Sequence, residues 1–275
     1  VNAAWLRILS IYSGVGAKKM QSTYLKTKDS LWIKGTNYPT VPSLRISLHS
    51  ADPLLTGVSE IAFARVAPST YGAIATSGIL RQIPINQALT FTNSPITGSA
   101  THWGSWNTLT GGNFLRSGQF LDTNGTPAPI TLTTGNNATI ASGTIRFAIE
   151  RGVFSDYFID AKLNWLIGTA FPIAPVSVRA SLGTGLQFDG AGTNSGLARQ
   201  PVLWGADATI ANYIRVANSA QVAFSAPASP LTLDSAGFYD ALTAGNLLWV
   251  GRFPSRIFGI GETPLWEISA INVDF

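Results

Sequence analysis

Alternating hydrophobic and polar residues predict half-buried strands in two distant parts of the chain. Leu44, Ile46 and Leu48 alternate with polar positions, and so do Val178, Ala180 and Leu182. Successive side chains of a strand point to opposite faces, so each segment has one face suited to a core. Further short strands, separated by Gly-, Asn- and Asp-rich turns, are expected at 61–67, 79–85, 88–92, 101–107, 113–120, 129–133 and 138–149, and at 197–204, 213–217, 221–225, 235–240, 246–253, 256–260 and 266–274.

A segment with helical patterning precedes each set of strands. Ser155 is a suitable N-cap and Gly168 suits the end of a helix. The earlier segment, from Ser22 to Gly35, is more polar. Both segments carry a Tyr and a Trp eight residues apart, which fall on nearly one helix face and are expected to anchor the helix on a sheet.

This pattern occurs twice in the chain, at an offset of 133 or 134 residues. The matching sets are Ser22, Tyr24, Trp32, Gly35, Pro39, Pro42, Ala64, Arg65 and Phe91, and Ser155, Tyr157, Trp165, Gly168, Pro172, Pro175, Ala198, Arg199 and Phe224. A repeat of this length has the size of a domain. We therefore predict a mainly β protein of two tandem β-sandwich domains, with mostly antiparallel strands and one N-terminal amphipathic helix in each. The predicted parts are an arm or linker at 1–20, repeat 1 at 21–150 and repeat 2 at 151–275.

Matching hairpin turns are predicted near the end of each repeat. They are Thr110-Gly111-Gly112-Asn113 and Thr243-Ala244-Gly245-Asn246. The second glycine occurs in both, and a backbone φ above zero at that position would explain it.

Charge is scarce and unevenly placed. Charged residues make up 12% of the chain, so much of the surface is neutral, and we infer that partner chains cover part of it. Five of the six lysines precede residue 35. These lysines and one arginine form a candidate assembly anchor for an acidic partner surface, or else a solvated helix face; the residues are Arg7, Lys18, Lys19, Lys26, Lys28 and Lys34.

Residue types that carry chemistry are sparse, and we expect no catalytic, metal or cofactor site. His49 and His102 lie in different parts of repeat 1 and have no histidine counterpart in repeat 2. The carboxylates are dispersed, and Asp156 and Asp160 are expected on a solvent-facing side of the second helix. No nucleic-acid motif and no apolar run long enough to span a membrane occur, so neither nucleic-acid binding nor membrane insertion is expected.

Several tryptophans lack a counterpart in the other repeat. They are candidates for contacts specific to one repeat, including stacking on a sugar, against the alternative that they pack in the core or between subunits. The candidates are Trp5, Trp103, Trp106, Trp204 and Trp266.

The repeat unit resembles a domain of bacteriophage tail-fibre-type virion proteins. In repeat 2 the resemblance rests on Ser155-Asp156-Tyr157, Trp165, Pro172, Ala198-Arg199 and residues 242–251. In repeat 1 it rests on Tyr24, Trp32, Pro39 and residues 57–65 and 109–118. The lysine-rich first helix departs from this pattern.

The resemblance implies a structural protein of the phage particle, in a tail fibre, baseplate or fibre adaptor, that acts through oligomeric assembly with other virion proteins. A homotrimer is the usual state of fibre-type proteins. The alternatives are a receptor- or carbohydrate-binding module at a fibre tip that recognises a host surface glycan, and a capsid decoration or head-fibre protein. Removal of residues 1–34 is expected to prevent attachment to the particle and to leave a folded body.

Overall fold

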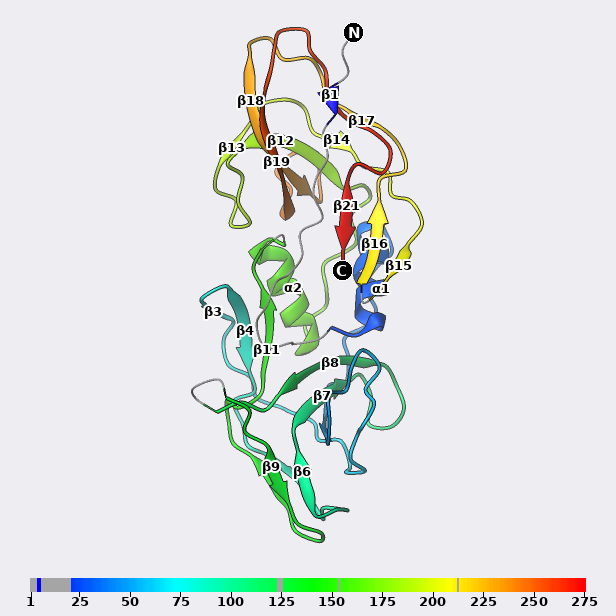
Figure 1. The fold of residues 1–275 in the computed structure, drawn as a ribbon, viewed down its shortest axis with the longest axis vertical. Helices are drawn as coiled ribbons and strands as arrows, with labels where there is room; N and C mark the ends of the chain where they lie inside the picture. Colours follow the sequence, from blue (N-terminus) through cyan, green and yellow to red (C-terminus); the bar gives the residue numbers. More distant parts are fainter. Residues whose placement is uncertain (1–3, 6–20, 123–125, 153, 212) are drawn as a thin grey trace.

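The structure, a computed structural model, describes residues 4–5, 21–122, 126–152, 154–211 and 213–275. The molecule is elongated, with residues 21–150 (repeat 1) in the lower half of Figure 1 and residues 151–275 (repeat 2) in the upper half. The two helices lie between the halves. The fold is mainly β with mostly antiparallel strands and one helix opening each repeat, as predicted.

Both helices begin and end as the sequence indicates. Helix α1 spans Thr23–Ile33 and α2 spans Asp156–Leu166. The N-cap Ser22 Oγ accepts a hydrogen bond from Leu25 N, and the Oγ of Ser155 accepts one from Phe158 N, so an otherwise unpaired donor of each first turn is satisfied. Gly35 and Gly168, with φ values of 93° and 108°, end the helices in the left-handed conformation that glycine adopts most easily.

The described residues of repeat 1 form two three-stranded sheets and two short strand pairs. The first sheet has the order β2-β7-β8, and the second has the order β11-β4-β3. The short pairs are β5 with β10 and β6 with β9. The bounds are β2 Arg45–His49, β3 Ala75–Ser77, β4 Leu80–Pro84, β5 Leu89–Phe91, β6 Gly98–Ala100, β7 His102–Trp106, β8 Phe114–Gln119, β9 Ile130–Leu132, β10 Ala138–Ile140 and β11 Arg146–Glu150.

Repeat 2 builds corresponding pairings, and the main strands of its first sheet are longer than those of repeat 1. Its first sheet has the order β13-β12-β18-β19, with β14 also paired to β12, and its second has the order β15-β16-β21. Strand β17 pairs with β20, which also receives β1 in parallel. The bounds are β1 Ala4–Trp5, β12 Arg179–Thr184, β13 Thr193–Asn194, β14 Gln200–Pro201, β15 Ala208–Ile210, β16 Tyr213–Ala217, β17 Val222–Ala223, β18 Leu231–Tyr239, β19 Leu247–Phe258, β20 Pro264–Trp266 and β21 Asn272–Asp274.

The strand registers of the two repeats agree. Arg45 pairs with Trp106 in repeat 1, and Arg179 pairs with Tyr239 at the corresponding place in repeat 2. The two sheets of a repeat share one core, which in repeat 1 includes Ile46 of β2 and Ile83 of β4.

Some strand predictions differ from the structure. Segment 61–67 forms only an isolated bridge at Val66, and 197–204 contains only β14 and a bridge at Trp204. Segments 138–149 and 266–274 are each interrupted by a turn, and the first three residues of 256–260 are the end of β19. A single apolar run does not show where the backbone must turn to begin a new sheet.

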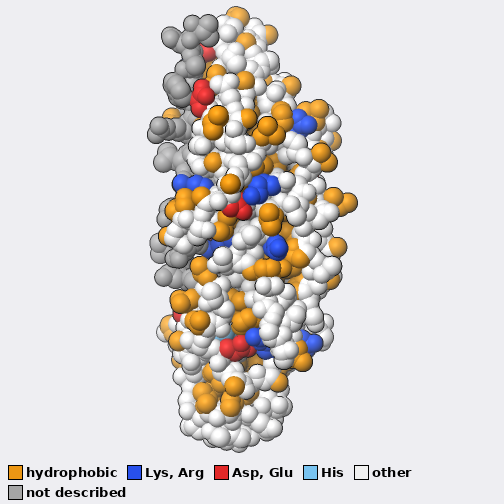
Figure 2. Space-filling view, turned by 90° about the vertical axis from the view of Figure 1, so that its right-hand side faces the viewer, with side chains coloured by type: hydrophobic (Ala, Val, Ile, Leu, Met, Phe, Trp, Pro, Cys, Tyr) orange, Lys and Arg blue, Asp and Glu red, His pale blue; other side chains and the backbone are white. Residues whose placement is uncertain are grey.

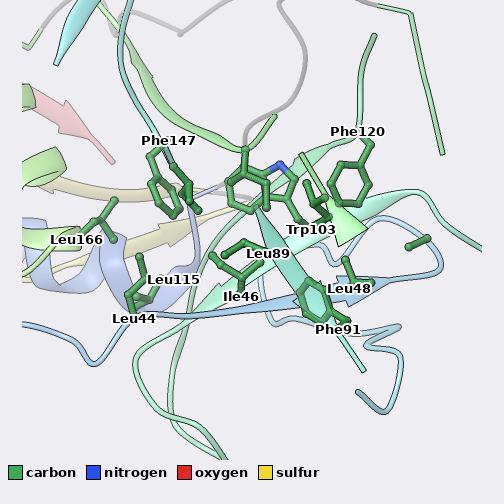
Figure 3. Close-up of a cluster of buried hydrophobic side chains, with 14 of the residues drawn as sticks. Leu44, Ile46, Leu48, Leu89, Phe91, Trp103, Leu115, Phe120, Phe147 and Leu166 are labelled. Carbon is green, nitrogen blue, oxygen red and sulfur yellow. The ribbon is translucent and has the colours of Figure 1, made fainter. Parts of the chain in front are cut away.

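Each helix contributes to the cores of both repeats. Leu25, in the first turn of α1, packs in the core of repeat 1, whereas Trp32 and Ile33 at its other end pack in the core of repeat 2. Helix α2 does the converse, and Figure 3 shows Leu166 among the side chains of repeat 1. The prediction that each helix is anchored on a sheet is therefore refined, because each helix spans two sheets from different repeats.

The shared glycine of the hairpin turns has a different cause from the one predicted. Gly112 has a positive φ but Gly245 does not, and the positive φ common to both turns is one position earlier, at Gly111 and Ala244. A Cβ on Gly112 would lie 2.5 Å from the Asn107 side chain. A Cβ on Gly245 would lie 2.6 Å from Asp240, at the corresponding position. Asn107 and Asp240 each accept a hydrogen bond from the backbone N–H of the turn, so glycine is required for room.

Candidate interface between the repeats

Reciprocal hydrogen bonds join the two repeats. Trp32 Nε1 donates to the carbonyl oxygen of Pro172 over 2.9 Å, and Trp165 Nε1 donates to that of Pro39 over 3.0 Å. Each tryptophan thus reaches the proline loop of the other repeat. Reciprocity of this kind is the mark of an isologous interface, in which the same patch is used by both partners. The contact between the repeats therefore has the form of a twofold dimer interface within one chain.

Equivalent residues meet each other at the centre of this interface. Asp29 and Lys162 occupy the same position of α1 and α2, and they form a direct ion pair with side chains 0% and 6% exposed. Tyr38 and Phe171, again equivalent, stack with ring centroids 4.2 Å apart. Only residues beside a twofold axis contact their own counterparts, so these two pairs locate the approximate axis.

Polar groups surround Asp29 on the repeat 1 side. One carboxylate oxygen accepts a hydrogen bond from Tyr38 Oη over 2.7 Å, and the other accepts from Gln21 Nε2 and Lys162 Nζ. Burial lowers the pKa of Lys162, an effect that the charge of Asp29 opposes and that of Arg116 reinforces. Burial also raises the pKa of Tyr38 well above its usual value, and the charge of Asp29 adds to this effect.

Arg116 is a second buried cation close to the same carboxylate. It is 4% exposed, and its Nη2 donates to the carbonyl oxygen of Ala148 over 3.2 Å. Burial lowers the pKa of Arg116 to about 10, although the nearby Asp29 acts in the opposite direction. Arg116 is therefore a second buried cation whose charge interacts with that of Asp29.

Aromatic side chains fill the corresponding positions on the repeat 2 side. Phe154 stands where repeat 1 has Gln21, and Trp249 stands where it has Arg116. The backbone is equivalent, because Gln21 bridges to Arg116 and Phe154 bridges to Trp249. Lys162 Nζ lies 5.5 Å from the ring centroid of Phe158 and 6.0 Å from that of Phe154. The repeat 2 side thus supplies aromatic rings but no carboxylate to this cluster.

Ion pairs at the edge of the interface join each helix to the opposite repeat. Nζ of Lys34, the C-cap residue of α1, lies 2.7 Å from the carboxylate of Asp207 in repeat 2. Arg81 of β4 in repeat 1 forms ion pairs with both Asp156 and Asp160 of α2. The expectation that these two aspartates lie on a solvent-facing side of α2 is corrected, because this side of the helix lies along β4 of the other repeat and both carboxylates are only partly exposed.

The residues of the predicted assembly anchor are not brought together by the described part of the structure. Arg7, Lys18 and Lys19 lie outside the described residues. Lys28 Nζ of α1 lies 5.2 Å from the ring centroid of Tyr24, and Lys34, just after the helix, pairs with Asp207. Lys26 is half-buried, and burial lowers its pKa, with a smaller contribution from Lys162. The lysines of the helix thus have roles within the chain.

Most of the unmatched tryptophans that the structure describes are core residues. Trp103, Trp106 and Trp266 are buried. Trp204 is half-buried and lies 5.9 Å from Trp249, centroid to centroid. Trp5 belongs to β1. The three buried indoles present no free face on which a sugar could stack, so the packing alternative describes them.

In each repeat, an arginine stacks on an aromatic side chain of the first sheet. The guanidinium carbon of Arg65 lies 3.6 Å from the ring centroid of Trp106, and that of Arg199 lies 3.5 Å from that of Tyr239. The Ala-Arg pairs shared by the repeats therefore have one structural role, which the spacing alone did not reveal. Arg65 also forms a two-pronged ion pair with Glu60.

His49 belongs to a chain of buried hydrogen bonds specific to repeat 1. Trp106 Nε1 donates to Ser47 Oγ over 2.9 Å, and this hydroxyl lies 2.8 Å from His49 Nε2. His49 Nδ1 lies 2.8 Å from the carbonyl oxygen of Val58, so Nδ1 carries the proton and donates it to this carbonyl in a hydrogen bond. Nε2 then accepts a hydrogen bond from Ser47 Oγ. With a neutral imidazole, each of these hydrogen-bonding groups has a partner, so His49 has a structural role.

The part of the chain that the structure describes contains no group of three or more His, Cys, Asp or Glu side chains placed to hold a metal ion. Among the same residues, no helix is long and apolar enough to cross a membrane.

The fold and its internal interface define a class of protein built by duplication of one β-rich unit. The two copies are joined by their helices, each of which packs in the cores of both repeats. Comparison with known families identifies the unit. The family described as podophage GP4 fiber I protein gp80 matches residues 21–148 and, a second time, residues 153–274. The chain belongs to this family and is a structural protein of the phage particle, as the resemblance implied. No curated protein matches the chain significantly.

Proposed function

We propose that the chain is a rigid segment of a phage fibre or fibre adaptor that acts by assembling with copies of itself and with other virion proteins. The observation that carries this proposal is the exchange of helix contacts between the repeats, which joins two domain-sized units into one elongated body (Figure 1). A spacer that transmits position or force along a fibre needs such a junction, because a flexible linker would let the units move independently.

The two ends of this body differ in polarity at equivalent places. Ser99 pairs with Thr131 near the end of repeat 1, and Thr232 pairs with Ile257 at the corresponding place in repeat 2. Ile257 is 67% exposed, and the nearby Ile260 is 73% exposed. Strand β1 also lies on repeat 2. We propose that the repeat 2 end, together with residues 1–20, faces another virion protein.

The surface supports assembly with further chains. Figure 2 shows hydrophobic side chains spread over the visible face, with few charged ones. Ile173 and Val176, in the proline loop of repeat 2, are 84% and 103% exposed. Exposed aliphatic residues on a surface of low charge favour association. We propose a homo-oligomer, and a trimer is the state expected for a fibre-type protein.

Deletion of residues 1–20 tests the anchoring part of this proposal. The expected result is a protein with unchanged circular dichroism that is no longer incorporated into phage particles, as measured by immunoblotting of purified particles. The deletion must stop before Gln21, because α1 contributes Leu25, Trp32 and Ile33 to the cores. The earlier expectation that removal of residues 1–34 leaves a folded body is therefore revised.

Two matched surface variants test which end is used. Ile257→Thr with Ile260→Thr gives the repeat 2 end the polarity of repeat 1, and Thr131→Ser with Thr134→Ser is the control at the other end. Incorporation should fall for the first variant and stay normal for the second. Normal incorporation of both the isoleucine variant and the 1–20 deletion would refute attachment through repeat 2. Light scattering of the purified chain measures the oligomeric state, and a monomer at all concentrations would refute self-assembly.

A further inference from the structure

The interface between the repeats is symmetric in its backbone but not in its charges. Trp32 and Trp165 make reciprocal hydrogen bonds, and equivalent residues meet at the centre. A surface that contacts its own counterpart could also pair with an identical copy of itself. Repeat 1 could then pair with repeat 1 of another chain, and repeat 2 with another repeat 2.

We infer that the buried Asp29–Lys162 pair makes this interface selective, so that repeat 2 accepts repeat 1 and rejects a second repeat 2. The partner of each surface is thus the other repeat, and the opposite charges of these two equivalent residues determine the choice.

Pairing of two repeat 2 surfaces would place two Lys162 side chains in contact. In the observed pairing, Lys162 Nζ bonds to Asp29 and to Gln21 Oε1, both from repeat 1. The repeat 2 positions that correspond to Gln21, Tyr38 and Arg116 are the aromatic residues Phe154, Phe171 and Trp249. Two buried ammonium groups would therefore face each other without an anion, which is strongly unfavourable in a low-dielectric interior.

Pairing of two repeat 1 surfaces would likewise place two Asp29 carboxylates in contact, so both self-pairs are disfavoured, and excluding either one is sufficient to direct the pairing. Every chain carries one repeat of each kind, so each rejected pair of repeat 2 surfaces leaves two repeat 2 surfaces available for repeat 1. Selectivity matters where several chains fold close together, because a wrong pairing would link chains through the interface that should close each one. The pair thus acts against alternatives that the symmetric backbone permits.

Lys162 should contribute to selectivity more than to stability. When Lys162 is replaced by Met, Asp29 keeps its hydrogen bonds from Tyr38 and Gln21, and Arg116 remains as a cation nearby. The Met side chain would lie near Phe154 and Phe158, where sulfur–aromatic contacts are favourable. Lys162→Met should therefore leave the repeats joined while removing the charge that rejects a second repeat 2.

The test uses the complete chain with a protease-cleavable sequence inserted after Gly152, which is exposed and has open space around it. The folded protein is cleaved, unfolded in urea and refolded, and native mass spectrometry then counts the species. The wild-type protein should give only pairs of one repeat 1 with one repeat 2. The Asp29→Asn/Lys162→Met protein, in which neither self-pair brings Asp29 or Lys162 charges together, should give homodimers of both repeats in addition, and the control Lys28→Met should behave as wild type. Wild-type homodimers in random proportion, or no homodimers from Asp29→Asn/Lys162→Met, would overturn the inference.

If the cleaved halves do not refold, the melting temperatures of uncleaved variants test whether charge at position 162 controls the pairing. Lys162→Asp places two carboxylates in contact, so its melting temperature should fall by roughly 10 °C, whereas Lys162→Met should melt close to wild type. Equal melting temperatures for the two variants would show that a charge at this position does not affect pairing of the repeats, and the inference would fail.

Discussion

Repeat 1 and repeat 2 share their strand pairings but fill equivalent positions with different chemistry. At the interface, repeat 1 has Gln21 and Arg116 where repeat 2 has Phe154 and Trp249. Both pairs of residues form the same backbone bridge. The comparison teaches that the shared residues define the backbone, since caps, proline loops and stacked arginines occur in both repeats. The residues that differ define which surface meets which.

The largest difference between the repeats should appear when Asp29 is changed. Asp29→Asn leaves Lys162 and Arg116 as buried cations without a counter-charge, so we expect a loss of about 3–5 kcal/mol in the free energy of unfolding. Lys162→Met at the equivalent position should cost less, because Tyr38 and Gln21 still donate hydrogen bonds to Asp29 and the charge of Arg116 still acts on it. Urea unfolding of the complete chain measures both. Equal losses would show that the two sides of the interface are energetically alike, against the comparison.

Interactions between residues close in sequence could be predicted, whereas contacts between the two docked repeats could not. The helices were predicted with their caps, because Ser155 and Gly168 act within one or two turns of chain. The sequence does not reveal that α2 covers β4 of the other repeat, since that contact depends on how two complete units dock. The opposite charges of Asp29 and Lys162 at equivalent positions are visible in the sequence. Their meaning appears only once the twofold arrangement is known.

The stacked arginines provide a comparison of intermediate size. Arg65 bonds to Glu60 and to two backbone carbonyl groups, whereas Arg199 bonds to the carbonyl oxygen of Ala241. Lysine cannot reproduce the planar stack or the two-pronged ion pair. We expect Arg65→Lys to lower the free energy of unfolding by about 2 kcal/mol and Arg199→Lys by about 1 kcal/mol. Urea unfolding measures both, and a greater loss for Arg199→Lys would contradict the assignment of the additional bonds to stability.

Acid should reveal the smallest difference, which comes from His49. Burial lowers the pKa of His49, although its bond to Val58 and the charge of Glu60 act in the opposite direction, while His102 and Arg65 lower it further. The folded state therefore holds the imidazole neutral, and the unfolded chain binds a proton at the usual pKa near 6.5. Because the unfolded state binds more protons, stability is fully present above that pH and falls as the pH decreases towards the folded pKa. Repeat 2 has Gly183 at this position and contributes no such effect.

His49→Gln tests this assignment, with His102→Gln as the matched control. Between pH 7.5 and 5, the wild-type protein should lose about 1 kcal/mol more in its free energy of unfolding than His49→Gln does. Carboxylates that titrate in the same range are present in both proteins, so their contribution cancels in the difference. Burial also lowers the pKa of the half-buried His102, so His102→Gln should remove a smaller part of the acid response. Urea unfolding at the two pH values measures these differences. An acid response in His49→Gln as large as in the wild type would show that the imidazole is not held neutral by the fold, and repeat 1 would then be no more sensitive to acid than repeat 2.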